Sequence, residues 1–174
     1  MSEQELVEEC IAGKSSAQEK LFKIYSGKLF AIALRYMGSR EEAEDVLQEG
    51  FIKIFKNLNQ WKGDGPLGGW MRRVVVNTAL TQLKSRIKKQ QEISIETAYS
   101  VHDYQESQLE KLQANDLMKV IAEMPTGYRT VFNLFAIEGY GHKEISEQLG
   151  INESTSKTQY LKAKNWLLKR IDER

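Results

Sequence analysis

Apolar residues recur at helical spacing along most of the chain, and this spacing predicts a series of α-helices. No stretch shows the sustained apolar and polar alternation of a half-buried β-strand. In the first half of the chain the helical pattern covers residues 5–11, 17–36, 41–58 and 69–88. These helices are separated by Gly13, by Gly38 and by the segment 63–66, and Ser39 before two glutamates predicts a capped helix start.

The second half of the chain shows further helical spacing and a distinct turn. Helices are predicted over residues 109–124 and 126–137, with Pro125 opening the second. The segment 139–164 is typical of a helix-turn-helix, because Ile145 and Leu149 share one face and Gly150 permits the turn. Asn152 is predicted to cap the last helix. The buried stripe of that helix is predicted to consist of Ser156, Tyr160, Ala163 and Leu167.

The last helix has a second face that points away from this buried stripe. It carries Lys157, Thr158, Leu161 and Lys162. Lysines suit phosphates, a hydroxyl suits base edges, and an exposed leucine suits a thymine methyl group. The pattern therefore predicts a helix that recognises double-stranded DNA. The alternative is an ordinary amphipathic hairpin whose lysine face is only solvated.

Between the two halves, residues 90–107 are rich in Ser, Gln and Glu and lack sustained helical spacing. We therefore expect an all-α protein of two helical domains, residues 1–89 and 108–174, joined by an acidic linker over residues 90–107. The net charge of +1 hides a segregation, because basic residues predominate over 61–89 and acidic residues over 90–116. Since a polyanion senses a local excess of Lys and Arg, the small total charge does not argue against nucleic acid.

Composition excludes several classes of protein. Cys10 is the only cysteine, so no internal disulfide or multi-cysteine zinc site is possible, and we expect Cys10 to be a small buried residue. His102 and His142 lack the partner spacing of a metal or catalytic site. No apolar run approaches ~18 residues and the N-terminus is acidic, so neither membrane insertion nor a secretory signal is expected. We expect a cytoplasmic protein that is not an enzyme and needs no cofactor or metal.

The helix predicted over residues 41–58 carries two different stripes. Its apolar core face is predicted to comprise Leu47, Phe51, Ile54, Phe55 and Leu58. The second stripe, called the acidic stripe below, consists of Asp45, Gln48, Glu49 and Ile52. It contains no Lys or Arg, and acidic and amide groups around one exposed apolar residue indicate docking onto a basic protein surface. The alternative is a solvated face with unpaired carboxylates.

The loop that follows this helix places two tryptophans, Trp61 and Trp70, around a glycine-rich bend. Aromatic side chains beside a flexible basic loop suit stacking on unpaired bases of single-stranded DNA. The next helix combines Arg72 and Arg73 with Asn77, whose amide suits the edge of an extruded base. Alternatively the tryptophans are core residues, and this is favoured for Trp70. It begins an apolar face predicted to continue through Val74, Asn77 and Leu80 or Thr81.

Three segments occur in an order that characterises one family: AEDVLQEGF at 43–51, NTAL at 77–80, and the helix-turn-helix near the C-terminal end. Over nearly its whole length the chain resembles the group IV, or extracytoplasmic-function, sigma factors, which are transcription-initiation subunits of bacterial RNA polymerase. The resemblance implies that the first domain binds the polymerase clamp and the −10 promoter element. The second domain is implied to bind the β-flap and recognise the −35 element. An anti-sigma factor is implied as a further partner.

The resemblance also assigns roles to individual residues. Asp45, Gln48 and Glu49 of the acidic stripe match the motif that docks on the clamp coiled coil of the largest polymerase subunit, and Ile52 is expected to bind the polymerase with them. The loop 60–69 matches the loop that captures a flipped base of the melted non-template strand, and Asn77 matches the asparagine lining that pocket. The residues expected at the −10 element are Gln60, Trp61, Lys62, Arg73, Asn77 and Lys84. Those expected at the −35 element are Ser154, Lys157, Thr158, Leu161 and Lys162.

The sequence departs from the family pattern at a few positions. Gly50 stands where the family usually has Thr or Ala, and it is expected to weaken its helix by up to ~1 kcal/mol. Leu67 and Gly68 stand where the loop more often has a phenylalanine and a polar or charged residue. Gly141 replaces the usual serine cap opposite Glu144, which leaves half of a capping box.

Two other interpretations compete with a sigma factor. A transcriptional regulator that binds DNA without polymerase explains the helix-turn-helix but not the acidic stripe. A helical protein-interaction module explains the helices if the basic faces are merely solvated. Association with core polymerase separates the three.

Overall fold

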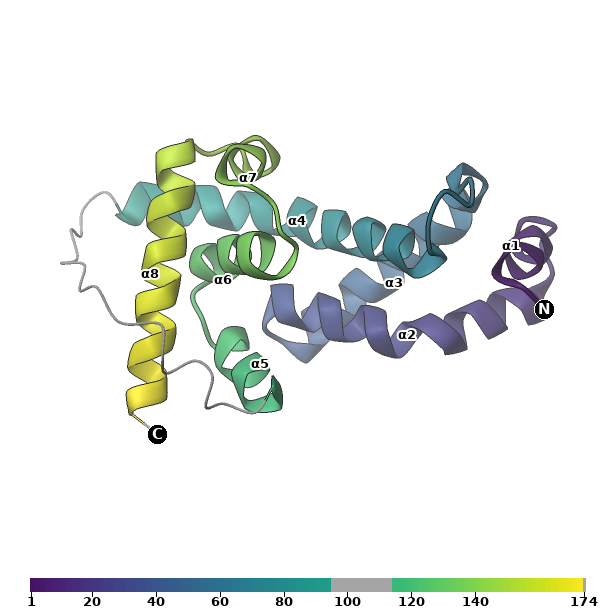
Figure 1. The fold of residues 1–174 in the computed structure, drawn as a ribbon, viewed down its shortest axis with the longest axis horizontal. Coiled ribbons are helices and arrows are strands. Elements are labelled where there is room, and N and C mark those ends of the chain that lie inside the picture. The colour runs from purple at the N-terminus through teal and green to yellow at the C-terminus, as the bar shows by residue number, and fades with distance from the viewer. Residues whose placement is uncertain (95–113, 174) are drawn as a thin grey trace. The chain divides into compact units, whose positions relative to one another are not determined.

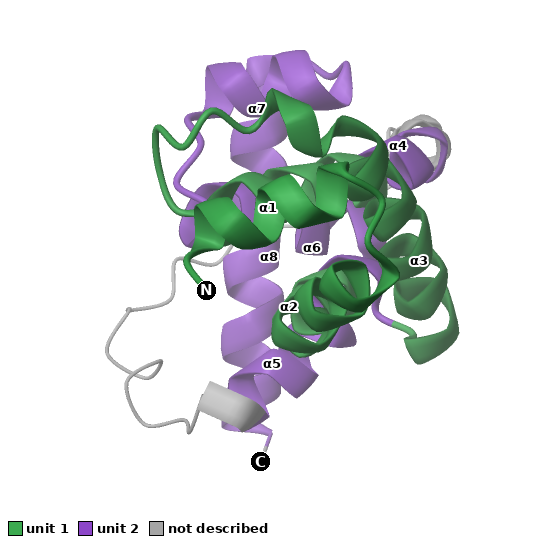
Figure 2. Ribbon diagram, turned by 90° about the vertical axis from the view of Figure 1, so that its right-hand side faces the viewer, with its two compact units in different colours: residues 1–34, 39–79 green, residues 35–38, 80–174 purple. Residues whose placement is uncertain are grey.

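The computed structural model describes residues 1–94 and 114–173, and every regular element in these ranges is helical (Figure 1). The chain divides into two compact units, which Figure 2 shows in different colours. Unit 1 comprises residues 1–34 and 39–79, and unit 2 comprises residues 35–38 and 80–174. The predicted all-α fold is confirmed for the part of the chain that the structure describes.

The helices of the N-terminal half match the predicted segments, with ends that differ by a few residues. They are α1 (Glu3–Ile11), α2 (Ser15–Met37), α3 (Arg40–Asn57), the short 3₁₀ turn η1 (Leu58–Gln60) and α4 (Leu67–Ser94). Ser39 caps α3 as predicted, because its hydroxyl accepts a hydrogen bond from the Glu42 amide. Since α4 continues to Ser94, residues 90–94 of the expected linker are helical, whereas residues 95–107 lie outside the described residues.

The buried face of α4 differs in phase from the predicted one. The expected face began at Trp70, but Trp70 and Val74 are only half-buried, and Asn77 is exposed. The side chains that are buried include Leu67, Met71, Val75, Thr78 and Ala79. Three consecutive valines satisfy either phase, so helical spacing alone could not distinguish the two faces.

The core face of α3 also differs in part from the predicted one. Phe51, Ile54 and Leu58 are buried as expected, whereas Leu47 and Phe55 are only half-buried at the margins of that face. Ala43, Val46 and Gly50 fill the centre of the buried face instead. The buried face of α3 therefore keeps three of the five predicted residues and extends to three that the helical spacing did not select.

Gly50 of α3 lies close to the side chain of Val75 on α4. A Cβ atom at this position would lie 3.0 Å from Cγ2 of Val75. Val75 is fully buried, and its β-branched side chain has little rotamer freedom in a helix. The sequence predicted only a helix-propensity cost at Gly50, whereas the structure gives this glycine a packing role.

Unit 2 holds the helices of the C-terminal half. They are α5 (Ala114–Ala122), α6 (Thr126–Phe132), the π-helical turn η3 (Asn133–Ile137), α7 (His142–Leu149) and α8 (Glu153–Asp172). The helix predicted over 109–124 is described from residue 114 onward, and residues 109–113 lie outside the described residues. The helix predicted over 126–137 ends in the wider turn η3, closed by a 2.9 Å hydrogen bond from the Glu138 amide to the Asn133 carbonyl.

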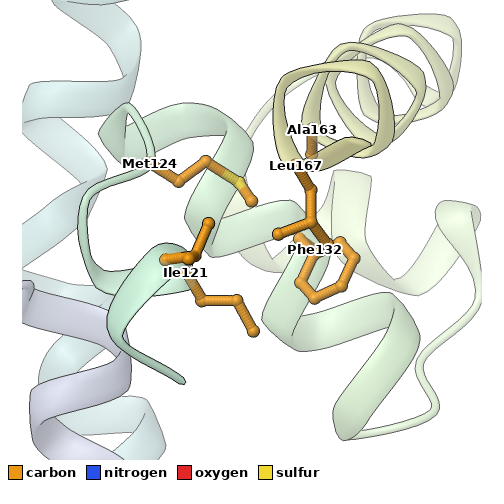
Figure 3. Packing of buried hydrophobic residues seen from close by; sticks show 6 residues of the cluster. Ile121, Met124, Phe132, Ala163 and Leu167 are labelled. Atoms are coloured by element: carbon orange, nitrogen blue, oxygen red, sulfur yellow. The ribbon is translucent and has the colours of Figure 1, made fainter. Parts of the chain in front are cut away.

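An apolar cluster joins α5, α6 and α8 at the centre of unit 2. In Figure 3, Ile121 and Met124 lie close to Phe132 and Leu167. The buried members of the cluster are Val120, Ile121, Met124, Phe132, Ala163 and Leu167. Ala163 and Leu167 belong to the stripe predicted for the last helix, and Ser156 of that stripe is buried too, whereas Tyr160 is only partly buried against the cluster.

Arg129 satisfies carbonyl groups at helix ends within unit 2. Only 6% of the residue is exposed. Its guanidinium donates hydrogen bonds of 3.0 and 2.9 Å to the carbonyls of Ala122 and Met124. It also donates bonds of 2.8 and 2.9 Å to the carbonyls of Tyr36 and Met37 in the same unit. Carbonyl groups in the last turn of a helix lack partners within the helix, and a planar guanidinium can serve several of them.

Candidate nucleic-acid and protein interfaces

The acidic stripe lies on the side of α3 away from its buried face. Asp45, Gln48 and Ile52 are exposed, and Glu49 is partly exposed. Ile52 is 63% exposed, which is unusual for a large apolar side chain within a helix flanked by core residues. The sequence correctly predicted the composition of this face and the exposure of its isoleucine.

A lysine beside the acidic stripe was missed. Lys53 Nζ lies 2.6 Å from Glu49 Oε1, one helical turn away. The same ammonium group donates a 3.4 Å hydrogen bond to the hydroxyl of Thr78 on α4. Glu49 is therefore partly neutralised and held toward α4, whereas Asp45 carries its charge on the open part of the face. The i, i+4 spacing of Glu49 and Lys53 was the signal in the sequence.

The loop between α3 and α4 is fixed by its own contacts. Trp61 is half-buried, and its indole N–H donates a 3.2 Å hydrogen bond to the Gly65 carbonyl. Gly63 has φ +79°, a left-handed conformation that favours glycine. Gln60 donates a 3.1 Å hydrogen bond to the side-chain oxygen of Asn57, and Lys62 is exposed. Trp61 thus closes the loop without entering the core.

The end of this loop is tied to α1 and α2. The Tyr25 hydroxyl donates a 2.7 Å hydrogen bond to Glu3, and the other oxygen of Glu3 accepts a 3.5 Å bond from the Leu67 amide at the start of α4. Burial, followed by the hydrogen bond and charge of Glu3, raises the pKa of Tyr25 to about 12. A Cβ on Gly68 would lie 3.1 Å from the Tyr25 ring. This arrangement was not predictable from local sequence, because Glu3, Tyr25 and Leu67 are far apart along the chain.

The polar residues proposed for single-stranded DNA occupy exposed positions on α4. Arg73 and Asn77 are exposed and lie one turn apart, so they share a face of the helix. Lys84 is exposed further along the same helix. Arg72 is only half-buried and lies at a different angle around the helix axis. Thus α4 presents both a cation and an amide to solvent just after the loop.

The helix-turn-helix of unit 2 has the predicted turn. Ile145 and Leu149 on α7 are fully buried, and Gly150 ends α7 in the left-handed conformation with φ +66°. The Gly141 amide donates a 2.8 Å hydrogen bond to Glu144, which is the remaining half of the capping box. These features confirm the prediction for α7 and the turn.

The predicted cap of α8 is right in its position but not in its hydrogen bond. Asn152 stands at the N-cap position of α8 with extended backbone, but its side chain makes no capping hydrogen bond. Only its carbonyl takes part, by accepting a 3.0 Å bond from the Ser156 amide. Asn152 is exposed, so water can reach the first amides of α8 in place of a side-chain oxygen.

His142 links the two helices of the motif. Its Nδ1 lies 2.9 Å from Oγ of Ser156, a fully buried residue of α8. The imidazole stacks on Phe135 with ring centroids 4.3 Å apart, and Phe135 also contacts Tyr160. Burial, and then the positive charge of Lys157, lower the pKa of His142. The sequence missed this role because the partners come from separate helices.

The outward face of α8 is largely as predicted. Ser154, Lys157 and Thr158 are exposed, and Leu161 and Lys162 are half-buried. The Thr158 hydroxyl donates a 3.0 Å hydrogen bond to the Ser154 carbonyl within the helix. Lys157 Nζ lies 2.9 Å from Glu153, an acidic residue at the start of this face that was not among the predicted site residues.

Two features that the described residues lack bear on other classes of protein. Among them, no cluster of His, Cys, Asp and Glu is suited to hold a metal ion. No helix in the described part of the chain is both long and apolar enough to cross a membrane. Cys10 is buried as expected, and burial followed by the charge of Glu9 raises the pKa of its thiol.

Comparison with known families gives this architecture its class. Residues 21–88 match the sigma-70 region 2 family, and residues 114–167 match the sigma-70 region 4 family. The chain belongs to the sigma-70 family of RNA polymerase sigma factors, within its extracytoplasmic-function group. It is a transcription-initiation factor, and the family binds core RNA polymerase and promoter DNA. Its homologues are sigma factors, which are not enzymes.

Named relatives span nearly the whole chain. RNA polymerase sigma-H factor of Pseudomonas aeruginosa is 25% identical over 173 residues, covering 93% of this chain and 90% of the relative. ECF RNA polymerase sigma factor SigW of Bacillus subtilis is 28% identical over 171 residues, covering 91% of each chain. Among solved structures, the sigma factor RpoE of Bartonella quintana, in complex with the anti-sigma factor NepR, has a TM-score of 0.49. It is 19% identical, and the match covers 87% of this chain and 94% of that one.

Proposed function

We propose that the acidic stripe of α3 binds the clamp coiled coil of the largest polymerase subunit. The support is the exposed Ile52 beside the charged Asp45 and the amide of Gln48. An apolar contact surrounded by complementary charge suits a protein partner with basic residues. Glu49 is already paired with Lys53, so Asp45 contributes more than Glu49 to the electrostatic attraction for a basic partner.

The loop 60–69 and the exposed face of α4 are proposed to bind the melted −10 element. Asn77 can donate to and accept from the edge of an extruded base, and Arg73 one turn away can bind a neighbouring phosphate. Trp61 has one ring edge tied to Gly65 and remains partly exposed, so its face can stack on a base. Gln60, Lys62 and Lys84 add polar and positive groups to the same function.

The outward face of α8 is proposed to recognise the −35 element in the major groove. Lys157 and Lys162 suit phosphates, whereas Thr158 and Leu161 suit base edges and methyl groups. Ser154 at the start of the helix can reach a phosphate or base. The single observation that carries this assignment is the turn at Gly150, which presents α8 as the second helix of the motif.

These surfaces assign functions to the two regions of the chain. Residues 1–89 bind core polymerase and the −10 element, and residues 108–174 bind the β-flap and the −35 element. Residues 90–107 link them. An anti-sigma factor that competes for these surfaces is proposed as a further partner, by analogy with the family. A regulator that acts without polymerase has no use for the acidic stripe and is not favoured.

The test is reconstitution of the full chain with core polymerase and selection of bound promoters from a randomised library. The expected result is a holoenzyme that selects a two-part promoter and initiates transcription from it. On a panel of −35 substitutions, Lys162→Ala should weaken binding uniformly, with the salt slope falling by about 1, whereas Lys157→Ala removes a cation that is paired with Glu153 in the free chain. Thr158→Ala and Leu161→Ala should alter preference at one or two base pairs. A chain that never associates with core polymerase contradicts the proposal.

A further inference from the structure

Glu153 places a negative charge on the surface proposed to face DNA. It is the first residue of α8, and its carboxylate lies 2.9 Å from Lys157 Nζ. Both side chains are exposed, at 49% and 60%. The hydrogen bond and charge of Lys157, with smaller effects from His142 and Lys143, lower the pKa of Glu153. The carboxylate therefore stays ionised among cations contributed by both helices of the motif.

This arrangement opposes DNA binding in two ways. A carboxylate at the interface repels phosphates, because the two charges have the same sign and a short separation. It also occupies Lys157, which can release a condensed counterion from a phosphate only when its own charge is available. Glu153 is the only acidic residue in the segment 153–162, so its effect is not shared by a neighbour on this face.

We propose that Glu153 is a positioning residue for specificity, which pairs with Lys157 and lowers the affinity of the helix for DNA of arbitrary sequence. On a matching −35 element, base contacts by Thr158 and Leu161 keep the helix in the groove. There Lys157 breaks its ion pair with Glu153 and binds a phosphate instead. On other sequences these base contacts are not made, and the ion pair of Lys157 with Glu153 persists. This inference rests on the proposed function of α8.

Two simpler roles make different predictions. If Glu153 accepts a hydrogen bond from a cytosine amino group, its loss should weaken binding only where that cytosine is present. If the pair with Lys157 merely supports the helix, its loss should change melting but not the salt dependence of DNA binding. The proposed role instead predicts tighter binding to unrelated sequences when the carboxylate is removed.

The experiment compares the affinities of full-length variants for a fluorescent duplex of randomised sequence. Fluorescence anisotropy measures the binding at a series of salt concentrations. Glu153→Gln keeps the side-chain size and removes the charge. It should bind about two- to five-fold tighter, the range expected for freeing one residue of an exposed ion pair. The salt slope should steepen by up to about 0.9 as Lys157 becomes available. Glu153→Asp should give an intermediate result, and Glu147→Gln, on exposed α7 surface, is the control for charge alone.

The decisive variant is the double mutant Glu153→Gln with Lys157→Met. If Glu153 acts mainly through Lys157, Glu153→Gln should gain clearly less affinity in the Lys157→Met background than in the wild type, and the gain that is left measures direct repulsion of phosphates. Three outcomes would overturn the inference: an equal gain in affinity in both backgrounds, an unchanged salt slope, or a loss of affinity only on duplexes that carry one particular base pair. If the wild-type chain fails to bind any duplex even at low salt, the proposed DNA-binding function of α8 fails instead. Circular dichroism melting confirms that each variant is folded.

Discussion

His142 Nδ1 of α7 and Ser156 Oγ of α8 lie 2.9 Å apart across the helix-turn-helix. Ser156 is fully buried, and the imidazole is stacked on Phe135, so neither group can turn to another partner without disturbing the packing. The contact fixes α8 relative to α7 at the point where α8 begins its outward face. A helix that recognises a groove depends on such support, because small displacements change which side chains reach the bases.

Ser156→Ala should therefore destabilise the protein by about 1 kcal/mol, since it leaves the partly buried imidazole nitrogen without its partner. Urea denaturation of the full chain, followed by circular dichroism, measures this. Ser154→Ala on the exposed face of the same helix is the matched control, and it should change the free energy of unfolding by less than about 0.5 kcal/mol. Equal effects at the two positions would show that the contact contributes nothing.

The lowered pKa of His142 predicts a pH dependence of stability. Its folded-state pKa lies below the unfolded value of about 6.5, so the unfolded chain binds the proton more readily. The contribution is fully present above the unfolded pKa and is lost as the pH falls from there toward the folded pKa. Stability measured between about pH 7.5 and pH 5.5 should decline less in His142→Gln than in the wild type. A decline identical in both proteins would assign the effect to other groups.

Gly50→Ala tests the contact between α3 and α4. Alanine favours the helix by up to about 1 kcal/mol, but its Cβ would lie 3.0 Å from the Val75 side chain, which is fully buried. We expect the steric effect to dominate, with a net destabilisation of about 1 kcal/mol. Gly27→Ala on α2, where a Cβ meets nothing within 4 Å, should instead stabilise the protein. Val75→Ala should relieve the strain of Gly50→Ala in the double mutant, and its failure to do so would contradict the packing role.

Charge reversal tests the acidic stripe. Asp45→Lys with Glu49→Lys should abolish association with core polymerase, because a basic partner would be repelled. The melting temperature should change little, since exposed charges contribute little to folding and the pair of Glu49 with Lys53 is partly exposed. Glu41→Lys, an exposed position in the first turn of the same helix, is the control and should still form holoenzyme. Wild-type affinity in the double mutant would refute the docking assignment.

Helical spacing was sufficient to predict where the helices lie. It predicted the buried face of a helix only where the apolar residues fit a single helical phase. Ala163 of the buried stripe of α8 was found because Lys162 and Lys164 flank it, whereas the run Val74 to Val76 fits two phases of α4 equally well. Contacts between helices were not predictable from one sequence. Gly50 appeared as a weak helix former, and His142 appeared to have no partner, because Val75 and Ser156 are distant along the chain.

Asn77→Ala should impair promoter opening more than initial duplex binding. The amide of Asn77 is exposed on α4 beside the loop 60–69, and an extruded base is available to it only after the strands separate. Holoenzyme containing the variant should bind a closed promoter duplex nearly as well as the wild type, while permanganate reactivity of the melted strand should fall. A promoter with a premelted −10 region provides a second template, on which the variant should lose affinity because the base contact is then made directly. Arg73→Ala should weaken binding with a shallower salt slope if that residue contacts a phosphate, which separates its role from that of Asn77. If Asn77→Ala reduced closed-duplex and premelted-template binding to the same extent, the residue would not act on an extruded base.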